Sequence, residues 1–162
     1  MDLNEFIAWV LDFEGSITIA IHRGRNGKIQ YEPKVSIMTT SKEHLHQFQQ
    51  RIGIGTACPT PHYRTNSNYS PSFAWRLSVK EIKEHLPKIR PFLFLKQEQA
   101  DCAIRLCEIK KPNHSRMNEY TADEQYEMTY LYNRCIALNA KVPEERTESD
   151  RFFLQLLKYS RK

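Results

Sequence analysis

Residues 7–17 of the chain read Ile7-Ala8-Trp9-Val10-Leu11-Asp12-Phe13-Glu14-Gly15-Ser16-Ile17. The apolar residues of this stretch recur at helical spacing, and Asp2 or Asn4 upstream can accept the free amide protons of a first helical turn. Gly15 is a natural helix stop. The isoleucines at positions 17, 19 and 21 then alternate with small or polar residues, as in a half-buried strand. The stretch therefore predicts a helix that runs directly into a strand.

Downstream of this strand the sequence predicts a hairpin. Residues 23–28 contain Asn26-Gly27, which is typical of a tight turn at a hairpin tip. A return strand over 31–38 alternates again, with Pro33 among its inward-facing residues. Because proline cannot donate a hydrogen bond to a neighbouring strand, we expect Pro33 at a sheet edge or a bulge.

The remaining patterns predict five further helices and two further strands. Thr40 or Ser41 can cap a helix that ends at Gly53 and Gly55. A loop over 56–72 with a short strand near 63–66 precedes a strand over 73–79. Helices follow at 79–91, interrupted by Pro87, and at 96–109, 122–138 and 147–159. The order αββαββα predicts an α+β fold, in a single domain of residues 1–162 with a core at 1–110 and a helical extension at 121–162.

Composition excludes several classes of protein. The chain has 162 residues, of which 40% are hydrophobic, which is enough for one buried core and too much for general disorder. Its four cysteines form no CxxC pair, so neither a disulfide scaffold nor a zinc site is expected. The apolar segments are too short to span a membrane, and the first residues lack a signal pattern. We therefore expect a soluble domain with no membrane partner.

The charge pattern permits nucleic-acid binding but does not establish it. The net charge is only +5, but helices can cover just one face of the predicted sheet. The other face and the hairpin tip carry polar and basic residues, and a ribbon of this kind can enter a DNA major groove. The alternative is an ordinary solvated sheet face.

Three stretches resemble a known family. Residues 7–17 resemble the LAGLIDADG motif of homing endonucleases in Ala8, in Asp12 and above all in the ending Glu14-Gly15-Ser16-Ile17. Residues 91–100 (PFLFLKQEQA) resemble a signature of its single-motif, homodimeric branch, the I-CreI type. Residues 52–55 and 136–139 also have counterparts in that branch. The resemblance implies the αββαββα homing-endonuclease fold, with an antiparallel DNA-binding sheet and C-terminal helices.

The resemblance also implies an activity, namely a metal-dependent double-strand break at a long, roughly palindromic DNA site. The metal would be Mg²⁺, with Mn²⁺ as a substitute. Glu14 matches the metal-binding acid, and the backbone carbonyl of Phe13 would be a second ligand. Lys96 matches a lysine near the scissile phosphate, and Thr39 falls nearest to a polar residue that holds water. For Glu14 the alternative is a solvated carboxylate, although the helix dipole disfavours an acid at this end.

Residues expected to contact DNA lie on the predicted sheet and its loops. Arg64 and Arg76 suit guanine, and Gln30 suits adenine. The residues expected to meet bases or nearby phosphates are Thr18, His22, Arg23, Arg25, Lys28, Gln30, Lys34, Ser36, Arg64, Asn66, Asn68 and Arg76. A C-terminal set, expected to meet phosphate, comprises Lys141, Arg146 and Thr147.

A single motif supplies one acid, whereas a double-strand cut needs two, so the resemblance implies a homodimer. Its expected interface comprises Ala8, Trp9, Asp12 and Phe13, with Asp12 capping or bonding the neighbouring motif helix. The family usually has glycine at the positions of Trp9 and Phe13. These bulky residues lie four apart, hence on one helix face, and they cannot fit the usual close helix crossing.

Two other functions stay open at this point. Some family members are RNA-binding maturases that help their host intron to splice, with intron RNA as the partner. A member that lost cleavage would be a DNA-binding protein alone. The family resemblance implies an intracellular protein, in a chloroplast, a mitochondrion or a prokaryotic cytoplasm.

Overall fold

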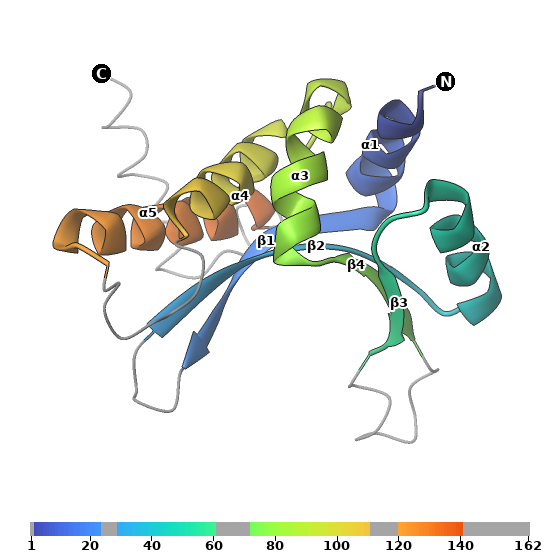
Figure 1. Ribbon diagram of the computed structural model, residues 1–162, viewed down its shortest axis with the longest axis horizontal. Coiled ribbons are helices and arrows are strands. Elements are labelled where there is room, and N and C mark those ends of the chain that lie inside the picture. The colour runs from blue at the N-terminus through green and yellow to red at the C-terminus, as the bar shows by residue number, and fades with distance from the viewer. Residues whose placement is uncertain (1, 24–28, 61–71, 111–119, 141–162) are drawn as a thin grey trace. The chain divides into compact units, whose positions relative to one another are not determined.

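The computed structural model describes residues 2–23, 29–60, 72–110 and 120–140 (Figure 1). The chain divides into two compact units. Unit 1 comprises residues 1–17 and 34–97, and unit 2 comprises residues 18–33 and 98–162.

The order of elements confirms the predicted α+β fold. The elements are α1 (Leu3–Glu14), β1 (Gly15–Arg23), β2 (Ile29–Thr39), α2 (Lys42–Ile52), β3 (Thr56–Pro59), β4 (Phe73–Leu77), α3 (Val79–Ile89), the 3-10 turn η2 (Arg90–Phe92), α4 (Gln97–Ile109) and α5 (Ala122–Asn139). The four strands form one sheet in the order β1-β2-β4-β3, and β4 pairs antiparallel with both β2 and β3.

Helix α1 begins and ends where the sequence predicts. Asp2 and Glu5 form a reciprocal capping box at its start. At its end Gly15 lies so close to the preceding turn that an added Cβ would stand 2.6 Å from Cα of Leu11. The chain therefore needs a glycine to pass directly from α1 into β1, and this passage places Glu14 at the junction of helix and strand.

Two expectations about local structure were wrong, whereas the position of Pro33 agrees with the expected sheet edge. Strand β3 lies at Thr56–Pro59, where a loop was expected, because pairing with β4 supplies hydrogen bonds that no local pattern signals. Helix α3 continues through Pro87 to Ile89. Pro33 lies inside β2, but beyond the last β2–β4 pair, Val35–Leu77, so it blocks no bond to β4. The expected strand near 63–66 and helix at 147–159 lie outside the described residues.

The core of unit 1 forms around Trp75, whose side chain is fully buried. Its indole Nε1 donates to the carbonyl oxygen of Ile54 at 2.8 Å, and the Phe48 ring meets it edge-on with centroids 5.4 Å apart. Helices α2 and α3 contact β4 and lie on one side of it, and no described helix of unit 1 covers the other side (Figure 1). The uncovered side is the sheet face that the sequence assigns to nucleic acid.

The core of unit 2 joins the β1–β2 ribbon to helices α4 and α5. The buried cluster consists of Ile19, Cys102, Leu106, Ile109, Met128, Leu131 and Cys135, with Tyr31 packed against it. On the surface Arg105 of α4 binds both carboxylate oxygens of Glu127 of α5, at 2.6 and 3.1 Å. The helices therefore cover the Ile19–Tyr31 face of the ribbon.

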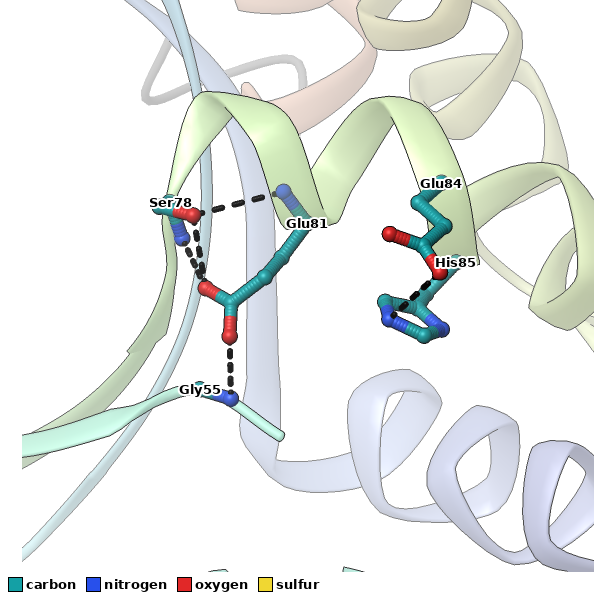
Figure 2. A network of polar contacts seen from close by, with 5 residues as sticks. All are labelled: Gly55, Ser78, Glu81, Glu84 and His85. Carbon is teal, nitrogen blue, oxygen red and sulfur yellow. Dashed lines mark hydrogen bonds and ion pairs between the residues drawn. The ribbon is translucent and has the colours of Figure 1, made fainter. Parts of the chain in front are cut away.

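A carboxylate network ties α3 to the turn after α2 (Figure 2). Glu81 accepts hydrogen bonds from the Ser78 backbone N–H and hydroxyl, at 2.8 and 2.7 Å, and from the Gly55 N–H at 2.8 Å. Burial raises the pKa of the Glu81 carboxyl, but these hydrogen bonds and the nearby charge of His85 outweigh it. The pKa is consequently held below its ordinary value, which means that folding favours the ionised form.

We expect the stability supplied by Glu81 to depend on pH. The lowered pKa means that this contribution is present above the ordinary value of 4.5 and is lost as pH falls through the lower folded value. Glu81→Gln should reduce the free energy of unfolding at pH 7 by about 1 kcal/mol, after discounting for exposure. Urea unfolding should show the gap closing below about pH 4. Glu84→Gln is the control, and a gap independent of pH would contradict the assignment.

Candidate functional site

Glu14 is an exposed carboxylate at the last residue of α1. The neighbouring Phe13 is 66% exposed, whereas Asp12 on the other side is buried. Within the last turn of α1, Asp12 therefore faces the interior, whereas Phe13 and Glu14 face solvent. Of the acids in the motif, only Glu14 is accessible to a phosphate or a metal ion.

Asp12 fastens α1 to the segment that precedes α4. Its carboxylate accepts the N–H of Phe94 at 2.6 Å and the N–H of Lys96 at 3.0 Å. Both bonds lie inside the same chain, whereas Asp12 was expected to cap or bond the neighbouring motif helix. Asp12 thus satisfies two backbone N–H groups of the segment before α4 and holds this segment against α1.

The four residues expected at the dimer interface differ in their exposure within the chain. Ala8 is fully buried and Asp12 is 7% exposed within their own chain. Both side chains are covered within the chain, because α3 and η2 pack against α1. Of the four residues expected at the interface, Trp9 and Phe13 are the accessible ones, and the assignment of Ala8 and Asp12 to the interface stays a prediction.

Lys96 reaches back to the carboxyl end of α1. Its Nζ donates to the carbonyl oxygen of Leu11 at 2.7 Å and also to that of Asp12. Burial lowers the pKa of the Lys96 ammonium, while the charges of Asp12 and Glu14 oppose this shift without cancelling it. A cation at a helix C-terminus is stabilised by the helix dipole. The structure thus brings Lys96 and Glu14 to the same helix end.

Thr39 is placed differently from the expectation that it holds water for catalysis. Its hydroxyl accepts the N–H of Ser41 at 3.1 Å, and Ser41 is the cap of α2. Thr39 also alternates with Met38, which is exposed on the uncovered sheet face. The hydroxyl therefore stabilises the turn into α2.

The uncovered face of unit 1 presents ordered rows of side chains. Ser36 of β2, Arg76 of β4 and Thr56 of β3 form one row across three strands. Arg76 is exposed, and Lys34 lies two residues before Ser36 on the same face of β2. Thr56 was not predicted as a member of this row because strand β3 was not predicted. The alternation of residues in β4 around Arg76 was the only sequence signal that pointed to the row. The row suits base edges or phosphates.

The β1–β2 ribbon of unit 2 carries a second polar face. Its residues His22, Arg23 and Gln30 are exposed, as expected. Thr18, by contrast, has a partner inside the protein. Burial raises the pKa of the Cys135 thiol to about 12. Hydrogen bonding by the Ile19 backbone and the Thr18 side chain lowers this pKa, but by less than burial raises it. Thr18 is half-buried.

The other expected DNA contacts lie outside the described residues. They are Arg25, Lys28, Arg64, Asn66, Asn68, Lys141, Arg146 and Thr147.

An exposed apolar surface surrounds the carboxyl half of α1. The rings of Trp9 and Phe13 stack with centroids 5.7 Å apart, so both project from one helix face as their spacing predicts. Trp9 is 54% exposed, and Phe94, tied to α1 through Asp12, is 86% exposed. Leu95 is also exposed. We call Trp9, Phe13, Phe94 and Leu95 the aromatic surface.

A single chain does not assemble a complete metal centre among the described residues, where no group of three His, Cys, Asp or Glu side chains comes together. The donors at the α1–β1 junction are the Glu14 carboxylate and the adjacent backbone carbonyls. Such hard oxygen donors fit Mg²⁺, which keeps several waters and binds through one or two carboxylates together with phosphate oxygens. In the described part of the chain, no helix is long and apolar enough to cross a membrane.

Comparisons by sequence and by structure differ in outcome. No family model and no curated protein matches the sequence. Among solved structures, the homing endonuclease I-CvuI, in complex with the I-CreI target in the presence of Mg, matches with a TM-score of 0.66 at 20% identity. The match covers 96% of this chain and 94% of I-CvuI.

Two further matching structures differ in how much of their own length this chain covers. The archaeal intron-encoded homing endonuclease I-Vdi141I, complexed with DNA, matches with a TM-score of 0.66 at 15% identity, over 98% of this chain and 97% of that one. The LAGLIDADG homing endonuclease I-SmaMI, bound to cleaved DNA, matches with a TM-score of 0.54 at 13% identity. Here 96% of this chain covers only 48% of I-SmaMI. The chain has the fold of the LAGLIDADG homing endonucleases, at the length of I-CvuI and I-Vdi141I.

Proposed function

We propose that this protein is a site-specific DNA endonuclease that uses a divalent metal and cuts both strands as a homodimer. The observation that carries the proposal is the accessible carboxylate of Glu14, held beside Lys96 at the end of α1 in a chain with this fold. A surface acid at a helix C-terminus opposes the helix dipole, so its position favours a functional role.

The metal we propose is Mg²⁺, with Mn²⁺ as a substitute. Glu14 would bind it through the carboxylate and Phe13 through the backbone carbonyl. When bound, the metal polarises the phosphate and lowers the pKa of a coordinated water. Asp12 and Lys96 keep the end of α1 in place through the bonds described above. We therefore propose that Lys96 positions the Glu14 carboxylate, besides offering positive charge near the phosphate.

A second copy of the chain completes the proposed site. Each chain supplies one accessible motif acid, and a twofold axis would bring two Glu14 residues to the two scissile phosphates. The aromatic surface is the accessible apolar region next to Glu14, and we propose that the second copy covers it. Because Trp9 and Phe13 stack outward, this interface would consist of interleaved aromatic rings instead of closely crossing backbones.

The uncovered sheet face is the proposed DNA-reading surface of unit 1. A polar β-ribbon face can enter the major groove and contact base edges. Arg76 occupies the middle of the Ser36–Arg76–Thr56 row, where its guanidinium suits the two acceptors of guanine. A twofold dimer then requires a roughly palindromic target.

Arg76→Ala is expected to relax the preference at one or two base pairs in each half-site. The loss should be about 1–3 kcal/mol of discrimination at those positions, because the bidentate contact to guanine disappears. The measurement is a base-preference profile from binding to randomised duplexes. Lys83→Ala on α3 is the control and should leave the profile unchanged. A uniform loss of affinity across all sequences would instead identify Arg76 as a phosphate contact.

The test of the function itself begins with a target. A duplex selected from a randomised library by repeated binding should be cut on both strands by the protein in Mg²⁺, and the wild-type chain should sediment as a dimer. Phe13→Ser, which places a polar group in the aromatic surface, should weaken dimerisation and double-strand cutting together. A monomer that still cuts both strands would contradict the symmetric model.

The same experiment separates the other functions. Tight duplex binding with no cutting in Mg²⁺ or Mn²⁺ would identify a DNA-binding protein without nuclease activity. Binding to a host intron RNA in preference to any duplex would identify a maturase. Because such reading frames lie inside introns of organellar or prokaryotic genomes, we propose a chloroplast, a mitochondrion or a prokaryotic cytoplasm as the location, to be tested by the genomic context of the reading frame.

A further inference from the structure

The β1–β2 ribbon of unit 2 carries one acid among its described residues, Glu32. Its Oε2 lies 2.9 Å from Nε2 of His22, and the two side chains are 41% and 47% exposed. Tyr31 and Pro33 on either side turn the other way, since Tyr31 packs against the buried cluster and Pro33 is buried. The pair therefore projects from the face opposite the helices.

A carboxylate is an unusual residue on a surface that meets DNA, because it repels phosphate. In the major groove it can accept hydrogen bonds only from the exocyclic amino groups of cytosine and adenine. Adenine presents an acceptor, N7, beside its amino group and so suits an amide side chain. Cytosine presents the N4 amino group alone, which suits a carboxylate.

We propose that Glu32, oriented by His22, reads a C·G base pair in each half-site by accepting a hydrogen bond from the N4 amino group of cytosine. This inference rests on the proposed function, because it needs the ribbon to meet duplex DNA. The contact with His22 engages Oε2 and leaves Oε1 with no partner among the described residues. His22 is a positioning residue here, since its contact restricts the rotamers of Glu32.

The test replaces the carboxylate by an amide. The full chain is bound to duplexes that are randomised across the selected target, and the bound sequences give a base-preference profile. Ca²⁺ replaces Mg²⁺ so that the duplexes are not cut. In the wild type we expect a C·G preference at one symmetric position. Glu32→Gln should replace it by an A·T preference, a change of about tenfold to a hundredfold at that position and little elsewhere. Glu43→Gln, an exposed acid on α2, is the matched control.

The role of His22 has its own pair of variants. His22→Ala should weaken the C·G preference several-fold, because Glu32 is no longer held. His22→Gln should restore most of it, since the glutamine amide nitrogen reaches the position of Nε2. A purely structural pair would change the melting temperature in both variants without moving the base preference.

Two results would overturn the inference. One is an unchanged profile in Glu32→Gln, and the other is a uniform change of affinity at all positions, which would leave Glu32 with an electrostatic effect only. The proposed function fails in a different way, through a wild-type chain that shows no base preference for any duplex. If the wild type binds a specific sequence and the Glu32→Gln variant has the same base preference, only the inference that Glu32 reads cytosine is contradicted. The proposed function then still stands.

Discussion

Glu14→Gln is expected to reduce the rate of DNA cleavage by about a thousandfold or more while leaving DNA binding within a few-fold of the wild type. A bound metal contributes several kcal/mol to the transition state, and each loss of about 1.4 kcal/mol slows the reaction tenfold. The amide of glutamine preserves the size of the side chain but is a far weaker ligand for Mg²⁺ than a carboxylate. Linearisation of a plasmid that carries the selected target measures the rate.

The control for this variant is Glu43→Gln, which removes an exposed carboxylate from α2 in the same unit. It should cut at the wild-type rate. Binding is measured with Ca²⁺ in place of Mg²⁺, so that cleavage does not consume the duplex. If Glu14→Gln cuts at the wild-type rate, Glu14 is not the metal-binding acid. If the variant also loses binding, the acid serves the fold or the interface, and a thermal melt distinguishes these two.

Gly55→Ala is expected to destabilise unit 1 by about 3–4 kcal/mol. Gly55 has φ +76°, and an added Cβ would lie 2.2 Å from Nε1 of the Trp75 ring. The left-handed backbone costs about 1 kcal/mol with a side chain, and displacing a buried ring costs about 1–3 kcal/mol more. The indole also donates to Ile54, so a displaced ring loses that hydrogen bond. Urea unfolding measures the loss.

Gly53→Ala provides a matched control two residues away. Gly53 has φ +71°, but nothing lies within 4 Å of the position of its Cβ. The control therefore isolates the backbone cost, and it should lose only about 1 kcal/mol. Equal losses in the two variants would contradict the packing of Trp75 against Gly55.

Some local predictions succeeded because the physical signal is itself local. Helix α1 has a cap, an apolar periodicity and a terminal glycine within residues 2–15, and all three act over short distances. Strand β3 was missed because its hydrogen bonds go to β4, beyond a segment of more than ten residues. The sequence analysis predicted that Pro87 interrupts its helix. Helix α3 instead continues because Leu86 and Ile89, on either side of Pro87, are buried, and a local rule does not include such packing.

The sequence by itself determined the α+β class, the helix-to-strand junction at Gly15, the shared helix face of Trp9 and Phe13 and the position of Glu14 at a helix end. Each follows from periodicity and steric rules within a few residues. Only the tertiary structure decided the partners of Asp12 and Lys96, which lie more than eighty residues apart in the chain. It likewise buried Ala8 and Asp12 within their own chain and paired His22 with Glu32. These outcomes depend on which distant segments of the chain pack together and exclude water from one another. A local sequence pattern carries no information about that packing.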